Sequence, residues 1–179
     1  MKSVSAMACA TIIGLSAATS ASAQTPQGLD ETLAFIRDTI AQLGPVSYAA
    51  NNTDPATGQS WTNQFTQEGS SVSIDAGGCQ IDLHWRTLYN GGVSFDGDGG
   101  IPFRLVDRVT VLSLDDDFAR VNASAGHSGW ITHTAPQLTV VSAVRPDGVE
   151  NIFYFADFDL AGRVAEAMRH AAQLCGGMK

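Results

Sequence analysis

An apolar stripe close to the C-terminus constrains the fold of this chain most strongly. Within 157–175, small and apolar residues recur at intervals of three and four, which places them on one face of a helix. The stripe consists of Ala161, Val164, Met168, Ala171 and Cys175. Asp157 is suited to cap the first turn, and Gly176 with Gly177 favours a left-handed stop. The pattern predicts a C-terminal helix whose apolar face must be covered by the rest of the chain.

A second helix is predicted over 29–43. Its apolar stripe comprises Leu29, Leu33, Ile36, Ile40 and Leu43. Gly44 followed by Pro45 ends it. The spacing is close to that of a coiled coil, so a helix that binds a partner is an alternative to a helix that packs on its own domain.

Between these helices, over 46–156, the apolar period changes to two, as in strands. Strands are predicted at 46–50, 61–66, 71–76, 79–86, 87–89, 93–95, 103–114, 118–122, 128–134, 137–144 and 151–156. Gly77-Gly78 and Asn90-Gly91 are hairpin signals of two residues each. A glycine-rich loop at 96–100 and a tight turn at 115–117 are expected among the other connections. Such connections predict an antiparallel meander, which the C-terminal helix closes on one side or at one end.

The first residues carry the pattern of an export signal. Lys2 precedes an apolar run over 4–18, and small residues then lead to an A-x-A site that ends at Ala23. This predicts a signal peptide over 1–23 and a protein exported to the periplasm or the medium. The apolar run is shorter than the roughly 20 residues that a membrane anchor needs. The remaining chain, 24–179, has the size of a single globular domain.

The charge of the chain argues against two classes of partner. Ten lysines and arginines face 18 aspartates and glutamates, a formal net charge of −8. Nucleic acids and anionic lipids are bound by clustered basic residues that neutralise phosphates. The basic residues here are scattered, so neither partner is expected, and we interpret the acidity as favouring solubility.

Two cysteines, Cys79 and Cys175, follow the predicted signal peptide, and an exported protein encounters conditions that permit disulfides. Strand alternation places Cys79 on the same face as Ile81 and Leu83, and Cys175 belongs to the apolar face of the last helix. If that helix packs on this strand, the two sulfurs meet in the core, which predicts a disulfide; two separate buried thiols are the alternative. No C-x-x-C pair is present, so a redox enzyme is not expected.

The second half of the chain carries a family resemblance. The residues concerned are Phe103-Arg104-Leu105-Val106-Asp107-Arg108-Val109, Ile152-Phe153-Tyr154-Phe155, Asp157-Phe158-Asp159 and Leu174-Cys175-Gly176-Gly177. From about Phe103 to Gly177 the chain resembles bacterial secreted proteins of uncharacterised function with a pleckstrin-homology-like barrel. The resemblance implies antiparallel strands capped by a C-terminal helix. Members that bind phosphoinositides carry a basic cluster in an early strand pair, whereas 81–95 offers only Arg86 and His84, so phosphoinositide binding is not expected.

The predicted fold class is therefore α+β. It comprises an N-terminal helix, an antiparallel β-meander or partly open barrel of the pleckstrin-homology-like kind, and a C-terminal capping helix.

The stretch 96–100 begins like a calcium loop, with Asp107 at its twelfth position. The motif needs Asp or Asn at the fifth position and Gly at the sixth, but the chain has Gly100 and Ile101 there. We interpret the stretch as a solvated turn.

The histidines do not have metal-ligand spacing. His127 and His133 are six residues apart on one strand, and no H-x-H pair is present. His84 alternates with Asp82 and Arg86, which indicates a polar outer strand face. No metal ion or cofactor is predicted.

Motifs for catalysis are incomplete. Gly126-His127-Ser128-Gly129 is similar to a nucleophile elbow, but Trp130 stands where the final glycine belongs. Glycosidase chemistry needs two carboxylates across a cleft, and the candidates on or near strands are Glu68, Asp75, Asp82 and Asp107. Trp61, Trp85 and Trp130 are candidates for a sugar or apolar site, although Trp85 alternates with Ile81 and Leu83 as a core residue does.

Two functions follow as hypotheses. The first is an exported, non-catalytic binding module whose sheet edges or N-terminal helix engage a protein or small ligand. The second is a hydrolase whose carboxylates, or His84, His127 and His133, converge only in the fold. A concave pocket lined by three titratable side chains would favour the enzyme.

Overall fold

The computed structural model describes residues 28–54, 56–124, 131–133 and 137–178. The signal peptide predicted over 1–23 lies outside these residues. No helix in the described part of the chain is long and apolar enough to cross a membrane.

The elements, in chain order, are α1 (Leu29–Gln42), β1 (Val46–Thr53), β2 (Ser60–Asp75), β3 (Gln80–Tyr89), β4 (Gly92–Pro102), the 3-10 turn η1 (Phe103–Leu105), β5 (Arg108–Ser113), α2 (Leu114–Ser124), β6 (Ile131–His133), β7 (Thr139–Val144), β8 (Glu150–Phe155) and α3 (Phe158–Leu174). A five-stranded sheet has the order β4-β3-β2-β1-β6, and a three-stranded sheet has the order β5-β7-β8. Every strand pair is antiparallel.

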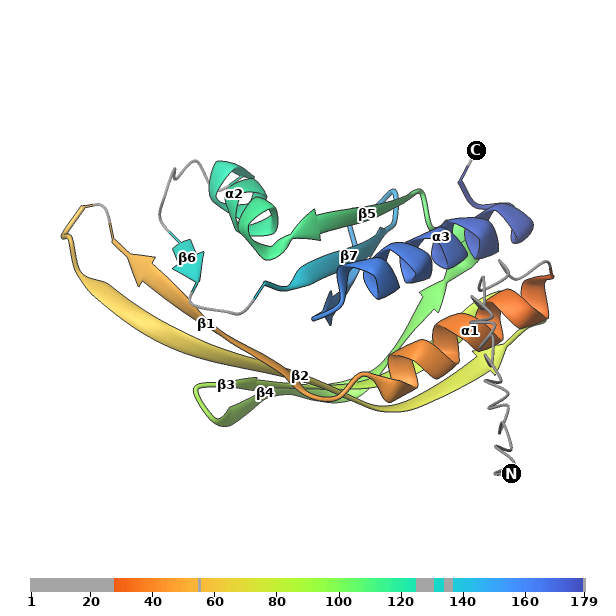
Figure 1. The fold of residues 1–179 in the computed structure, drawn as a ribbon, viewed down its shortest axis with the longest axis horizontal. Coiled ribbons are helices and arrows are strands. Elements are labelled where there is room, and N and C mark those ends of the chain that lie inside the picture. The colour runs from red at the N-terminus through yellow and green to blue at the C-terminus, as the bar shows by residue number, and fades with distance from the viewer. Residues whose placement is uncertain (1–27, 55, 125–130, 134–136, 179) are drawn as a thin grey trace, which may run out of the picture.

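Both terminal helices and the small sheet lie on the same side of the large sheet (Figure 1). α1 packs on β2 and against α3, and α3 packs on β5 and β7. The main core gathers apolar residues from both helices and both sheets, among them Ile36, Ile81, Phe153 and Met168. The predicted α+β class, with a helix at each end and antiparallel sheets between, is confirmed, and the described strands form two open sheets without closing a barrel.

The two predicted amphipathic helices are confirmed with small changes at their ends. Leu33, Ile36 and Ile40 of α1 are almost completely buried against the same domain. In α3 the buried face contains Ala161, Val164, Ala165, Ala167, Met168, Ala171 and Ala172. The carboxylate of Asp157 accepts a hydrogen bond from the Leu160 amide at 3.0 Å, so it caps the first turn as predicted.

The Asn90-Gly91 hairpin is confirmed as the connection between β3 and β4. Asn90 and Gly91 both have positive φ, 49° and 79°, as a tight hairpin of this length requires. The side chain of Asn90 adds two bonds to β2: its Oδ1 accepts from the Gln64 amide at 2.7 Å, and its Nδ2 donates to Asn63 Oδ1 at 3.1 Å. This turn is therefore anchored to a third strand.

The connection between β2 and β3 differs from the prediction. It consists of the four residues 76–79, and Cys79 lies in the turn with φ 56° instead of opening the strand. Asp75 is the reason, because its Oδ1 accepts a hydrogen bond from the Gly78 amide at 2.8 Å and holds a wider turn. Cys79 is nevertheless 5% exposed and bonds to Cys175, with an S–S distance of 2.12 Å. The disulfide ties this turn to the end of α3.

The strand predicted at 118–122 is wrong, because these residues belong to α2. Ser113 Oγ accepts a hydrogen bond from the Asp116 amide at 3.0 Å, a side-chain cap that starts a helix. The acidic group 115–117 is the first turn of that helix and not a tight turn between strands. Aspartates in this position are stabilised by the positive end of the helix dipole.

Other strand boundaries also differ. The stretch 96–100 is part of β4 and not a loop, and the strands predicted at 61–66 and 71–76 form one long strand, β2, with a bulge between Gly69 and Ser71. The strand predicted over 103–114 is divided into η1 and β5.

Candidate functional site

The outer face of β2, β3 and β4 holds a group of titratable side chains. On β3, Ile81 and Leu83 are buried on the inner face, so the residues that alternate with them, Asp82, His84 and Arg86, lie on the opposite face. That face points away from α1 and α3 (Figure 1). The register places Asp98 of β4 directly opposite His84.

His84 is held between two carboxylates of β4. Its Nδ1 lies 2.7 Å from Asp98 Oδ1, and its Nε2 lies 2.9 Å from Asp96 Oδ1. An ionised carboxylate only accepts hydrogen bonds, so both ring nitrogens must donate, and this requires the imidazolium form. The hydrogen bond to Asp98 is the largest influence that raises the pKa of His84, and the bond to Asp96 adds to it against an opposing desolvation. The trio is an ion-pair cluster on an open surface.

The neighbouring charged groups are also engaged. Arg86 lies 3.6 Å from the Glu68 carboxylate across the β2–β3 ladder. Asp82 accepts a hydrogen bond from the Gln80 side chain and one from Ser73 Oγ at 3.5 Å. His84 and Arg86 are therefore paired with carboxylates, whereas the two groups that donate to Asp82 are neutral.

An open depression of about 440 Å³ adjoins the trio and is lined by Ser73, Asp82, Leu83, Asp98 and Gly99. Its lining residues come from three neighbouring strands, β2, β3 and β4, and it is open to solvent, so ligands approaching it remain in contact with water. Such a surface suits recognition of a charged or polar group more than chemistry that depends on a water-excluded site.

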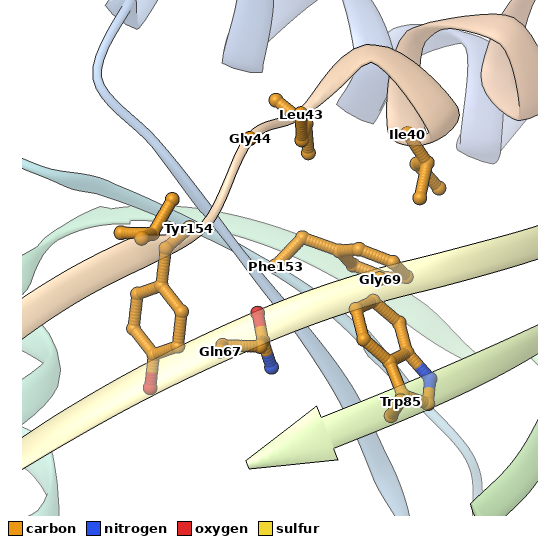
Figure 2. Close-up of a pocket in the computed structure, with 9 residues that line it drawn as sticks. Ile40, Leu43, Gly44, Gln67, Gly69, Trp85, Phe153 and Tyr154 are labelled. Atoms are coloured by element: carbon orange, nitrogen blue, oxygen red, sulfur yellow. The ribbon is translucent and has the colours of Figure 1, made fainter. Parts of the chain in front are cut away.

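The inner side of the same strands has a hollow where the N-terminal helix meets the sheet. Figure 2 shows Trp85 and Phe153 side by side there, with Gln67 and Tyr154 beside them. The ring centroids of Trp85 and Phe153 are 5.0 Å apart, and the side-chain amide of Gln67 donates to the Ile152 carbonyl at 3.2 Å. The free volume is about 10 Å³, at the threshold for one water molecule. This hollow is a packed junction between elements.

The structure separates most of the residues that the sequence suggested as site candidates. His84 lies on β3 and His133 on β6, with β2 and β1 between them. His127, Trp130 and the motif at 126–129 lie outside the described residues. His170 lies on α3, which packs on β5 and β7.

The calcium-loop pattern is not realised. Asp96 and Asp98 accept from His84, and Asp107 precedes β5 in the other sheet. In the portion of the chain that the structure describes, no group of three or more His, Cys, Asp or Glu side chains is placed to hold a metal ion. Trp85 packs against the core as its alternation predicted, and Trp61 is 48% exposed at the far end of β2.

The pairing of His84 with Asp96 and Asp98 was not anticipated from the sequence. A regular hairpin around Asn90-Gly91 starts from the pair Tyr89 with Gly92, and each step back along β3 is then matched by one step forward along β4. That register would place His84 opposite Gly97 and both aspartates on the core face. A bulge between the pairs Leu88–Val93 and Thr87–Phe95 shifts the register by one residue and brings Asp98 opposite His84. The aspartates themselves, which cannot be buried unpaired, were the available signal for the bulge.

No family model, curated protein or solved structure matches this chain.

Proposed function

We propose that the protein is an exported, non-catalytic binding module that recognises a cationic partner with the outer face of β2, β3 and β4. One observation carries the proposal. His84, Asp96 and Asp98 are titratable side chains that the fold brings together, and they lie on an exposed sheet face and not in an enclosed pocket.

The charge of this face supports a cationic partner. Its carboxylates are Glu68, Asp75, Asp82, Asp96 and Asp98, and its cations are His84 and Arg86. Even with His84 protonated, negative charge is in excess, and such a field attracts cations and speeds their encounter with the surface. An anionic phosphoinositide headgroup would meet that excess, which argues against it as a ligand.

Export is part of this proposal. It rests on the signal-peptide pattern over 1–23, with the mature domain at 24–179, and is supported by the Cys79–Cys175 disulfide, since such bonds persist in oxidising compartments. The resemblance to secreted proteins with a pleckstrin-homology-like barrel, which covers η1, β5 to β8 and α3, concerns the fold and export more than the function. The hydrolase is the competing function.

The test is calorimetric titration of the purified, oxidised protein with a lysine-rich and a glutamate-rich peptide of equal length. We expect binding of the lysine-rich peptide alone. Replacing two carboxylates of this face, Asp96→Asn with Asp98→Asn, should weaken it. The matched control, Asp30→Asn with Asp159→Asn, removes the same charge from the exposed first turns of α1 and α3 and should bind as the wild type does.

Two results would contradict the proposal. One is equal affinity for both peptides. The other is equal weakening by the two double variants, because binding would then follow the net charge of the protein and not this face.

A further inference from the structure

The strand β4 forms a long edge of the large sheet. Among the described strands, it has β3 on one side and none on the other. Seven of its residues from Gly92 to Gly99 are exposed, and Gly97 is half-buried. β6, at the opposite edge, has three residues. An open edge presents backbone donors and acceptors that a further strand can pair with.

The hydrogen-bonding alternation identifies which groups are free. The Phe103 amide donates to the Cys79 carbonyl at 2.9 Å. Along an antiparallel ladder every second residue pair is hydrogen-bonded, so Gly97, Gly99 and Ile101 also bond to β3. Asp96, Asp98 and Gly100 then direct their N–H and C=O groups away from β3. Within the described ranges, no hydrogen bond to these outward backbone groups is found.

At the edges of the small sheet, outward backbone carbonyls have side-chain partners. On β5, the outward carbonyl of Val109 accepts from the Arg169 guanidinium at 3.3 Å. On β8, the outward carbonyl of Ile152 accepts from the Gln67 amide at 3.2 Å. Side chains from neighbouring elements thus engage both of those edges, whereas β4 has no comparable contact in the described part of the chain.

The two faces of β4 offer different surroundings to an added strand. On the outer face, Asp96 and Asp98 share a single cation, His84, so one negative charge remains for a partner. On the inner face, Gly97 and Gly99 carry no side chains. Beside them lie the Phe95 ring, 3.3 Å from where a Cβ of Gly97 would be, and Trp85, 3.8 Å from where a Cβ of Gly99 would be.

We propose that β4 accepts an extended segment of a partner protein as an additional antiparallel strand across 96–100. This inference rests on the proposed function and names its partner: a segment that alternates basic and apolar residues. Its basic side chains lie beside Asp96 and Asp98, and its apolar side chains cover Gly97 and Gly99 next to Phe95 and Trp85. Backbone hydrogen bonds supply affinity, and the alternating side chains supply specificity.

A second copy of this chain does not fit the same edge. Antiparallel pairing of β4 with β4 would set Asp96 and Asp98 of one copy against the same carboxylates of the other, and like charges directly opposite are destabilising. Charged residues on an edge strand act against such self-association.

The experiment uses a capped peptide of alternating lysine and valine, titrated into the oxidised protein. Its comparison peptide has the same side chains in the same order, but its lysines are methylated at the backbone nitrogen. The lysines lie opposite Asp96 and Asp98, so this change keeps every charge and removes the N–H donors that face β4. Amide hydrogen exchange supplies the second readout. We expect the exchange of Asp96, Asp98 and Gly100 to slow on binding, because their outward N–H groups acquire partners, while the amides of Gly97 and Gly99 already bond to β3.

The variant Asp96→Asn with Asp98→Asn should bind the unmodified peptide roughly tenfold more weakly, the combined effect of two opposite-charge pairs. Equal affinity for the N-methylated peptide, or unchanged exchange at Asp96, Asp98 and Gly100, would overturn strand addition while leaving a cation-binding face intact. If neither the lysine-valine peptide nor its N-methylated form binds, both proposals are overturned. A dimer in sedimentation that the peptide dissociates would assign the edge to a second copy instead.

Discussion

Asp98 Oδ1 lies 2.7 Å from Nδ1 of His84, on the neighbouring strand and in direct register with it. Asp96 approaches the other ring nitrogen at 2.9 Å, so a single imidazolium joins two carboxylates of the same edge strand. The protonation state of His84 is thereby linked to the pairing of β3 with β4.

The pKa of His84 should exceed its ordinary value, and Asp98→Asn should lower it more than Asp96→Asn does, because the Asp98 hydrogen bond contributes most. A group whose pKa is raised on folding stabilises the native state below its unfolded pKa, about 6.5, and that contribution disappears as the pH rises through the folded pKa. NMR titration of the imidazole measures the pKa. Identical titration in the wild type and both variants would exclude the ion-pair cluster.

Replacing Cys175 by Ser should lower the melting temperature of the oxidised protein by several degrees. The bond closes a loop with a sequence separation of 96 residues, and the chain-entropy model assigns a loop of that size about 4–5 kcal/mol as an upper figure. Differential scanning calorimetry measures the change. Reduced wild-type protein is the control and should melt close to the variant; no difference between oxidised wild type and Cys175→Ser would contradict the stabilising role.

Replacing Asn90 by Ala should destabilise the protein by about 2 kcal/mol, because Ala tolerates positive φ poorly and lacks the bonds to Gln64 and Asn63. Asn90→Gly retains the backbone freedom and loses only the side-chain bonds, so it should cost less. Urea denaturation gives both values. Both variants lack the side-chain bonds, so a Gly variant that is the less stable of the two would contradict a cost of positive φ at this turn.

Deleting Ser94 should be far more damaging than Ser94→Ala. The substitution removes one hydrogen bond, to the Thr87 carbonyl at 3.1 Å, worth about 1 kcal/mol. The deletion removes the bulge residue and drives the aspartates of β4 toward the core face. Equilibrium unfolding and the yield of folded protein compare the variants; similar stability of the two would show that the register does not depend on the bulge.

Protein secreted by a bacterial host should begin at Gln24. Intact-mass spectrometry reads the cleavage site directly, and Ala23→Arg, which spoils the A-x-A site, should leave unprocessed chain. Retention of the N-terminal segment in exported wild-type protein would refute the predicted signal peptide.

The strongest local patterns determined the parts of the fold that depend on neighbouring residues. The stripes of α1 and α3, the Asp157 cap and the Asn90-Gly91 turn are each encoded within one element, because helix periodicity, capping and left-handed turns are properties of a few consecutive residues. The pairing of Cys79 with Cys175 was also foreseeable, since both carry a burial pattern and no other cysteine follows the predicted signal peptide.

Tertiary structure alone decided the features that depend on register between strands. A one-residue shift at Ser94 moves every later side chain of β4 to the opposite face, and the alternation of a glycine-rich segment is too weak to reveal it. For the same reason 96–100 read as a loop, although pairing with β3 makes it a strand. The His84 cluster and the free edge of β4 both follow from that register, because contacts between strands depend on which residues face one another and not on the composition of either strand.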